Sequence, residues 1–251
     1  MEAADILPID CWQSIFKHLD DEELEAVSLV CKDFFTISNI CRDSLLVIQP
    51  RVGLLSRQLK RFNQLKNIYL IMLRGDLDSV ILEIARSLIS LDAFHIRDSG
   101  KFKIESLEEL GSNPNMKNLK VLKFWLKGLH DDDLVVIANS FPNLEQLDLE
   151  NLNYLTEDNS FTDFGVEILA SKLKLLKKIR IVGYFLSDRS VVALASNCVF
   201  LQDVTITCNR NHGMTENGIG FLLRNRPTLV ALSIGGIKMN SSVYNHYSKF
   251  N

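Results

Sequence analysis

The residues with the strongest chemistry in this chain are its five histidines and five cysteines, and neither set forms a reactive or metal-binding motif. No histidine has a partner at the spacing of a zinc motif such as HExxH. The sequence also has no GxSxG nucleophile motif, no phosphate-binding loop and no CxxC pair. We therefore predict a protein that is not an enzyme and that holds no metal and no cofactor.

The cysteines are odd in number and scattered, at Cys11, Cys31, Cys41, Cys198 and Cys208. This distribution does not indicate a disulfide framework. A free cysteine behaves as a small hydrophobic residue, so we expect buried, reduced thiols.

The remaining candidates are charged and aromatic side chains whose positions depend on a repeat. The pattern L-x-x-L-x-L, with any aliphatic or aromatic residue at the leucine positions, begins at Leu65, Leu91, Leu119, Leu144, Leu176, Leu201 and Leu229. The spacings run from 25 to 32 residues, which is the range of leucine-rich repeats. A weaker unit, LLVI at Leu45, precedes them.

Each repeat predicts a strand, a turn and a helix. The last two apolar positions of the pattern alternate, as in a strand with one buried face. The helices are predicted from FTDFGVEILA at Phe161, LSDRSVVALA at Leu186, MTENGIGFLL at Met214 and LHDDDLVVIA at Leu129. Thr162, Ser187 and Thr215 are their expected N-caps. Stacked units of this kind predict an α/β solenoid with parallel strands on the concave face and helices on the convex face.

The outward positions of the strands form a candidate substrate surface. Its predicted members are His95, Arg97, Lys123, Trp125, Asp148, Lys178 and Arg180. Trp125 is either an exposed anchor for a partner or a partly buried residue at the end of its strand. The cations either bind an acidic partner or form a solvated face.

The net charge of −3 conceals an asymmetry between the two parts of the chain. Residues 1–50 contain ten of the 31 acidic residues and three of the 28 basic ones, so they carry −7 and the remainder carries +4. This division indicates two units with different partners. A charge of +4 over the remainder does not indicate nucleic-acid binding.

No apolar run reaches the roughly 18 residues that span a bilayer, and no signal peptide is recognisable. We therefore expect no membrane partner and a location in the cytoplasm, the nucleus or both.

Residues 5–45 depart from the repeat and predict three short helices. Pro8 suits a first helical turn, and an apolar stripe of Cys11, Trp12, Ile15, Phe16 and Leu19 follows it. Asp20 or Asp21 caps a second helix, with Glu23 as a possible capping-box partner. Phe34, Phe35 and Ile37 predict a third short helix or turn.

The order of these residues resembles the F-box. The stretch L-P-x-x-x-x-x-x-I-F-x-x-L begins at Leu7, and V-S-x-V-C-K-x-F follows at Val27. Many F-boxes have tryptophan where this chain has Phe34. The repeats resemble those of plant-like F-box/leucine-rich-repeat proteins. The line CVFLQDVTITCN at Cys198 is similar to their cysteine-containing form, although Asn209 and not a cysteine stands at its twelfth position and Cys208 one place earlier.

The resemblance implies a substrate-receptor subunit of an SCF-type cullin–RING ubiquitin ligase. The F-box at 1–45 would bind a Skp-type adaptor and the repeats at 46–251 an unknown protein substrate, leading to ubiquitination and proteasomal degradation. The implied adaptor-binding residues are Leu7, Pro8, Ile15, Phe16, Leu19, Leu24, Val30, Cys31 and Phe34. Trp12 and Leu19 stay undecided between partner and core. The competing hypothesis is a leucine-rich-repeat interaction scaffold without a ligase role.

The end of the chain leaves two alternatives open. Tyr244, Tyr247 and Phe250 form a short capping helix, or the chain is a truncated member of a longer family.

Overall fold

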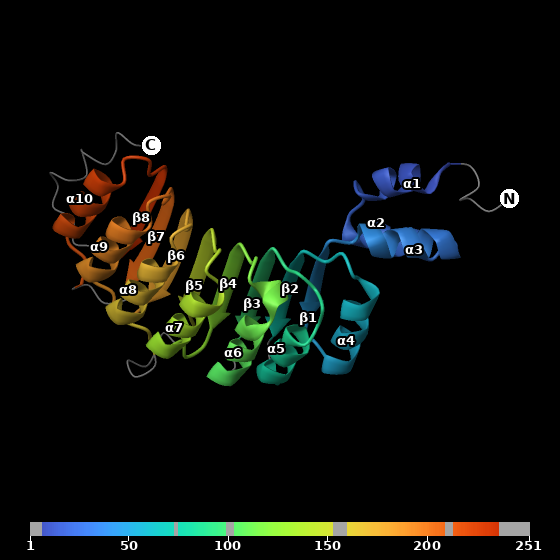
Figure 1. Ribbon diagram of the computed structural model, residues 1–251, viewed down its shortest axis with the longest axis horizontal. Helices are drawn as coiled ribbons and strands as arrows, with labels where there is room; N and C mark the ends of the chain where they lie inside the picture. Colours follow the sequence, from blue (N-terminus) through green and yellow to red (C-terminus); the bar gives the residue numbers. More distant parts are fainter. Residues whose placement is uncertain (1–6, 73–74, 99–102, 153–159, 209–212, 236–251) are drawn as a thin grey trace.

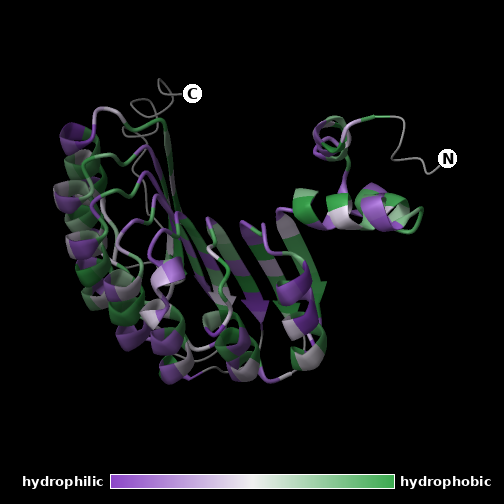
Figure 2. Cartoon of the chain, turned by 45° about the vertical axis from the view of Figure 1, so that its right-hand side comes forward, coloured by the Kyte–Doolittle hydropathy of each residue, from purple (hydrophilic) through white to green (hydrophobic). Residues whose placement is uncertain are grey.

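The computed structural model describes residues 7–72, 75–98, 103–152, 160–208 and 213–235. The chain forms a curved array of strands and helices, with three further helices at its N-terminal end (Figure 1). The strands line the inner side of the curve and the helices line the outer side (Figure 2). None of the helices in these ranges is long and apolar enough to cross a membrane.

The N-terminal unit contains three short helices. They are α1 (Ile9–Phe16), α2 (Asp21–Ser28) and α3 (Lys32–Cys41). Asp20 accepts a bond from the backbone of Glu23, whose side chain accepts one from Asp20 N–H, so the expected capping box is present at α2. Pro8 is the N-cap of α1 and not its first residue.

One parallel sheet of eight strands runs through the array in sequence order. The strands are β1 (Ser44–Ile48), β2 (Asn67–Met72), β3 (Ala93–Asp98), β4 (Val121–Leu126), β5 (Gln146–Asn151), β6 (Lys178–Gly183), β7 (Asp203–Cys208) and β8 (Ala231–Gly235). The sequence pattern predicts each of these strands, including the weak first unit. Sequential order with every strand parallel is what stacked units require, because each unit contributes one strand.

A helix follows each of the first seven strands. These helices are α4 (Val52–Arg61), α5 (Leu77–Ala85), α6 (Ile104–Ser112), α7 (Asp131–Ser140), α8 (Asp163–Lys172), α9 (Asp188–Asn197) and α10 (Glu216–Asn225). A short 3₁₀ turn, η2 (Pro114–Met116), follows α6. The α/β prediction is therefore confirmed, and the architecture is compatible with a repeat solenoid. The predicted capping residues Tyr244, Tyr247 and Phe250 lie outside the described residues, as does Asn209.

The same backbone bonds recur at the start of neighbouring strands. The carbonyl of Asp92 accepts from Lys120 and Val121 N–H at 2.9 and 3.0 Å, and the carbonyl of Lys120 accepts from Glu145 and Gln146 at 2.8 and 2.9 Å. This repetition fixes the register, so equivalent side chains of successive strands stand side by side.

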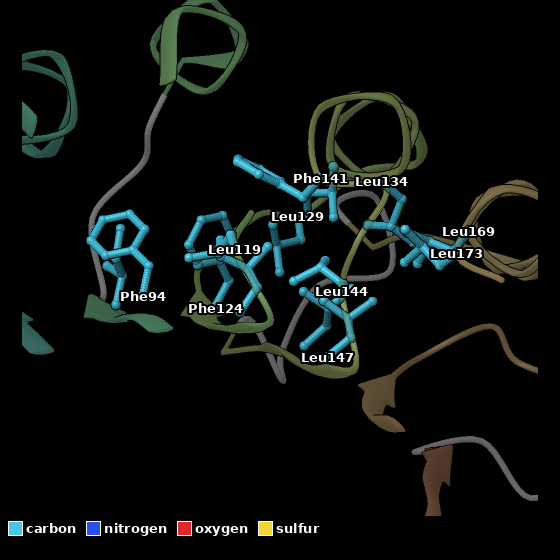
Figure 3. Packing of buried hydrophobic residues seen from close by; sticks show 14 of the residues in the cluster. Phe94, Leu119, Phe124, Leu129, Leu134, Phe141, Leu144, Leu147, Leu169 and Leu173 are labelled. Atoms are coloured by element: carbon cyan, nitrogen blue, oxygen red, sulfur yellow. The ribbon is translucent and has the colours of Figure 1, made fainter. Parts of the chain in front are cut away.

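The leucine positions of the pattern form one continuous core between the sheet and the helices. Leu119, Leu122 and Phe124 are fully buried there, and Phe94 and Phe124 meet edge to face at 6.0 Å (Figure 3). Because each strand and helix buries only one face, the units depend on their neighbours for this core.

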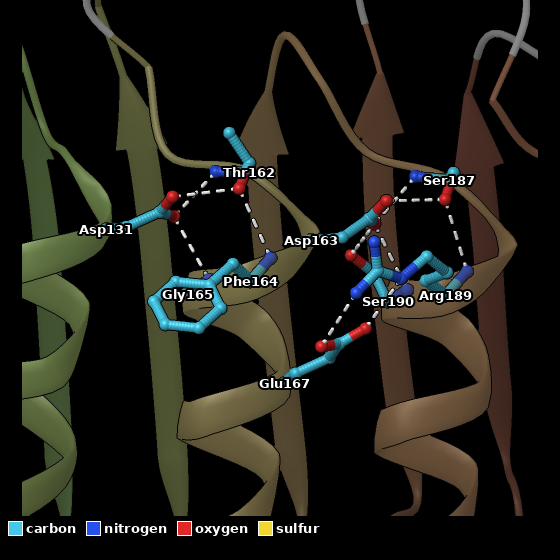
Figure 4. A network of polar contacts seen from close by, with 9 residues as sticks. All are labelled: Asp131, Thr162, Asp163, Phe164, Gly165, Glu167, Ser187, Arg189 and Ser190. Carbon is cyan, nitrogen blue, oxygen red and sulfur yellow. Dashed lines mark hydrogen bonds and ion pairs between the residues drawn. The ribbon is translucent and has the colours of Figure 1, made fainter.

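Carboxylates join successive helices at their N-termini. Asp131 of α7 accepts from Thr162 N–H and Oγ1, both at 2.8 Å, and from Gly165 N–H at 3.0 Å (Figure 4). Asp163 of α8 accepts in the same way from Ser187 and Ser190. These bonds satisfy helix-terminal N–H groups that have no partner within the helix.

This geometry explains the residues that recur at these helix starts: a hydroxyl residue, then an acidic residue, and glycine two positions after the acid, as in Thr162, Asp163 and Gly165. Thr162, Ser187 and Thr215 cap their helices as predicted. The glycine is a matter of space: a Cβ on Gly165 would lie 2.5 Å from Asp131 Oδ1, and one on Gly218 would collide with Asp188. Where serine replaces glycine, at Ser190, its hydroxyl donates to the carboxylate instead.

Two arginines connect the three-helix unit to the array. Arg42 donates to the carbonyl of Asp21 at 2.9 Å and lies over the ring of Phe62, 4.9 Å from its centroid. Arg61 of α4 donates to Asn39 of α3 at 2.7 Å and lies over the ring of Phe35 at 4.5 Å. The two units are thus held together by polar and stacking contacts at the sheet's first edge.

Candidate interaction surfaces

The core of the three-helix unit is aromatic and small. Phe16 lies 5.1 Å from Phe34 and 6.1 Å from Trp12, measured between ring centroids, and Trp12 lies 4.7 Å from Phe34. Leu24 and Ile37 complete the buried cluster. Trp12, undecided from the sequence, therefore packs with the core, although its indole N–H finds no hydrogen-bond partner.

Three residues predicted to bind a partner lie inside this core in the isolated chain, and their part in adaptor binding stays a prediction. Phe16, Leu24 and Phe34 are 2%, 5% and 7% exposed. The apolar stripe on α1 is wider than the surface that the three helices can bury. Phe16 is the member of it that faces the other helices, where it meets Leu24 and Phe34 in the core. In the isolated chain they hold the helices together and do not present a docking surface.

Other predicted residues are on the surface. Leu7, Ile15 and Val30 are 38%, 44% and 61% exposed, and Pro8 is exposed as well. Leu19 and Cys31 are half-buried against the core. The structure adds Ile9 at 57% and Leu29 at 81%. We call Leu7, Pro8, Ile9, Ile15, Leu29 and Val30 the apolar surface of the three-helix unit.

Sequence reasoning missed Ile9 and Leu29 for different reasons. Ile9 is the first residue of α1, two positions before the stripe used for the prediction begins. Leu29 follows the last residue of α2, so a helical periodicity does not show which way it points. An unbroken run of apolar residues at a helix end, here Leu29 and Val30, is the signal that was available.

The thiols only partly follow the prediction of buried cysteines. Cys198 and Cys208 are buried, and burial raises the pKa of Cys198 to about 11. Cys31 and Cys41 are half-buried, whereas Cys11 is exposed on α1, where the prediction was wrong. All five are free.

The inner face of the sheet arranges the second set of predicted residues in two rows. The first row is Leu46, Tyr69, His95, Lys123, Asp148, Arg180, Thr205 and Ser233, one residue from each strand in register. The second is Ile48, Ile71, Arg97, Trp125, Glu150, Val182, Thr207 and Gly235. Lys178 belongs to neither row, because it begins β6 beside Gln146 and Asp203.

A network of charges occupies the middle of these rows. Asp148 Oδ1 accepts from Trp125 Nε1 at 3.0 Å and from Arg180 at 2.9 Å. Arg180 also donates to Glu150 Oε2 at 2.8 Å. The Asp148 and Glu150 side chains are only 14% and 15% exposed, so these ion pairs are shielded more than ordinary surface pairs. The predicted residues Asp148 and Arg180 therefore bind each other.

Trp125 lies among cations. The guanidinium carbon of Arg97 lies 5.6 Å from the centroid of its ring, and that of Arg180 lies 5.4 Å away. Both distances are within the range of cation–π attraction. Trp125 is half-buried, with its indole N–H held by Asp148. Trp125 therefore combines the two alternatives, an exposed anchor and a partly buried residue. Its ring is exposed enough to contact a partner, and it is already held in place before a partner binds.

His95 behaves as an uncharged aromatic residue, unlike the charged residues predicted for this surface. Its ring meets that of Tyr69 edge to face at 4.4 Å. Burial and then the charge of Lys123 lower the pKa of His95 to about 4, against a smaller opposing effect of Asp148. At neutral pH the imidazole is therefore uncharged.

The inner face ends in an apolar area that the sequence analysis did not single out. Leu46 and Ile48 on β1 are 53% and 63% exposed, and Ile71 on β2 is half-buried beside Ile48. The signal was present in LLVI at Leu45, whose alternate residues are all apolar. Such a strand is expected to be covered on both faces. Val182 of the second row, farther along the inner face, is buried at 7% exposure.

Neither surface resembles a metal or catalytic centre. Within the described ranges, no group of three or more histidine, cysteine, aspartate or glutamate side chains is placed to hold a metal ion. A cavity of about 760 Å³ lies where the three-helix unit meets the array, and its lining includes Leu19, Ile40 and Lys66.

The fold and the two surfaces define a class of architecture: a small, incompletely covered helical unit joined to a curved strand–helix array. Comparison with protein families makes the first unit more specific. Residues 5–44 match the family model of the F-box domain. This match supports an F-box protein, and an F-box domain implies binding to a Skp-type adaptor within a cullin–RING ligase.

Proposed function

We propose that this chain is the substrate receptor of an SCF-type ubiquitin ligase. The F-box binds a Skp-type adaptor through its apolar surface, Leu7, Pro8, Ile9, Ile15, Leu29 and Val30. The array, which we assign to the leucine-rich-repeat class, holds a target protein on its inner face. The target is then ubiquitinated and degraded by the proteasome.

One observation carries this proposal: the short segment that matches the F-box domain, residues 5–44, gathers seven exposed large apolar side chains, Leu7, Ile9, Ile15, Leu29, Val30, Phe35 and Ile40. A unit with a core of Phe16, Leu24, Phe34 and Ile37 is too small to bury its remaining apolar surface. Exposed apolar side chains gathered in a short stretch are typical of protein interfaces.

The test is co-expression with a Skp-type adaptor, followed by purification of the complex. We expect a stable complex, and we expect Val30→Glu to weaken it at least about tenfold, because a buried charge would replace an interface contact. Val199→Glu is the matched control, since Val199 on the array is 55% exposed and Val30 is 61% exposed. The proposed docking surface would be ruled out if the adaptor does not bind this chain, or if it binds Val30→Glu and the unmodified chain with equal affinity.

Targets can then be sought by proximity labelling with the proteasome inhibited. Proteins that accumulate with the unmodified chain and not with Val30→Glu are expected to be substrates. If the same proteins associate with both chains and their abundance never changes, the scaffold hypothesis would replace the ligase hypothesis.

A further inference from the structure

The inner face of the array divides into two chemically different areas. On β1 and β2 the two rows present Leu46, Ile48, Tyr69 and Ile71, which carry no charge; we call this the apolar end. On β3 and β4 they present Arg97, Lys123 and Trp125 next to His95; we call the first three the cationic centre. The apolar end is the one nearest the F-box (Figures 1 and 2).

Among the described residues, the cationic centre has positive charge that no ion pair neutralises. Arg180 is paired with Asp148 and Glu150. Arg97 is exposed and makes a stacking contact with Trp125, and Lys123 makes no ion pair within the described part of the chain. The two carboxylates of the rows are thus opposed by three cations, and the surplus lies on β3 and β4.

Arg97 is also prepared to bind an anion. Its contact with the Trp125 ring restricts the guanidinium, while the ring itself is fixed by Asp148. A guanidinium held in this way leaves its planar N–H donors available for a carboxylate and loses less side-chain freedom on binding. The neutral His95 adds no competing charge between this group and the apolar end.

The distance between the two areas limits what can bridge them. Neighbouring strands lie about 4.8 Å apart, so β1–β2 and β3–β4 are separated by roughly 10 Å. An extended chain covers that span with about three residues. A single segment running across the strands can therefore place apolar side chains on the apolar end and acidic ones on the cationic centre.

We propose that the inner face binds a protein segment in which one or two large apolar residues are followed or preceded, about three residues away, by acidic residues. The apolar residues lie on Leu46, Ile48 and Ile71, toward the F-box, and the carboxylates lie against Arg97 and Lys123. This inference rests on the proposed function, because it names the chemistry of the target that the receptor would hold.

The experiment is a selection of random 12-residue peptides displayed on phage against the full chain in complex with its adaptor. We expect the selected peptides to be enriched about twofold or more in aspartate and glutamate, with a leucine, isoleucine, valine or phenylalanine about three positions away. The double variant Arg97→Glu, Lys123→Glu should bind the best peptide about tenfold less tightly or worse, since attraction becomes repulsion. Lys117→Glu, Lys172→Glu makes the same charge change outside the inner face and should retain binding.

A second variant tests the other area. Ile48→Lys should weaken the same peptide while leaving its dependence on salt in place. Selected peptides without acidic enrichment, no selected peptide at all, or equal binding to the charge-reversed variant would overturn the inference. The adaptor would still be bound in each of these cases, so this failure is distinct from a failure of the proposed function, in which the adaptor does not bind.

Discussion

The three-helix unit and the strand–helix array differ in how completely they bury their apolar side chains. Both present apolar faces that must leave water. In the array, Phe94, Leu119 and Phe124 are fully buried because each unit covers the next. In the three-helix unit, a core of comparable aromatic character leaves Ile9 and Leu29 more than half exposed. In a stack, each added unit buries the apolar face of the one before it. Three short helices need another molecule to bury their remaining apolar side chains.

Polar groups separate the two regions less clearly. In the array, Asp131 and Asp163 satisfy the helix N-termini of the following units. Buried groups without a hydrogen-bond partner occur in both regions, namely the indole N–H of Trp12 in the three-helix unit and Nε of Arg226 in the array. The comparison therefore concerns apolar cover, and the apolar side chains that each region leaves exposed mark the surfaces where a partner is expected.

The largest expected effects come from the same truncation made in each region. Phe124→Ala should lower the free energy of unfolding of the array by about 3–5 kcal/mol, because it empties a fully buried site. Phe34→Ala should instead unfold the three-helix unit, abolish adaptor capture and leave the array's transition in place. Urea unfolding followed by far-UV circular dichroism measures both. A loss of the array's transition in Phe34→Ala would show that the two regions fold as one.

A pair of glycine substitutions tests the tightness of the array itself. Gly165→Ala should destabilise the chain by about 1–3 kcal/mol, because the new methyl group displaces Asp131 from its three hydrogen bonds. Gly53→Ala meets nothing within 4 Å on an exposed turn of α4 and should stabilise by about 0.5–1 kcal/mol. Thermal unfolding of both variants is the measurement. The same sign for both would remove the steric explanation of the motif.

The junction between the regions is expected to have a smaller effect. Arg42→Met should destabilise the attachment of α2 and α3 by about 1–2 kcal/mol, since it removes a hydrogen bond and a stacking contact from a side chain that is 12% exposed. Hydrogen–deuterium exchange in α2 and α3 should accelerate. Arg189→Met, which breaks an ion pair at a side chain that is 68% exposed, is the control and should leave exchange unchanged.

The last expected effect concerns His95. An NMR titration should give a pKa of about 4 for its imidazole in the folded chain. An unfolded histidine titrates near 6.5, so the unfolded chain binds the proton first. His95 therefore contributes to stability above about pH 6.5, and this contribution is lost as the pH falls toward 4. His95→Asn should reduce that pH dependence, whereas a folded-state pKa near 6.5 would mean that the ring is solvated.

The sequence was most informative where a pattern repeats. Seven occurrences of one apolar spacing predicted the strands, and hydroxyl residues at Thr162, Ser187 and Thr215 predicted the helix starts, because both depend on local chemistry. Outward strand positions were also predictable, so His95, Arg97, Lys123 and Trp125 do stand together on one face.

Prediction failed where the answer depended on a neighbour in space. The stripe on α1 could not show that Phe16 packs on Phe34, since a helix with an apolar face looks the same whether a sister helix or a partner protein covers it. The ion pairs of Arg180 span strands that lie some 30 residues apart in sequence. The role of Asp131 and Asp163 was likewise hidden, because acidic residues in a first turn are favourable to any helix.

The carboxylate that joins one helix to the next also sets conditions on how such a chain can lengthen during evolution. From α7 to α10, each joint needs an aspartate on one side and, on the other, a hydroxyl residue with glycine or serine three positions later. A duplicated unit from this segment has compatible ends and can be inserted without new adjustments. Among the described residues no acidic side chain of α6 makes this bond to α7. Insertions and deletions of whole units are therefore expected to be accepted more readily in the second half of the array than at the α6–α7 joint.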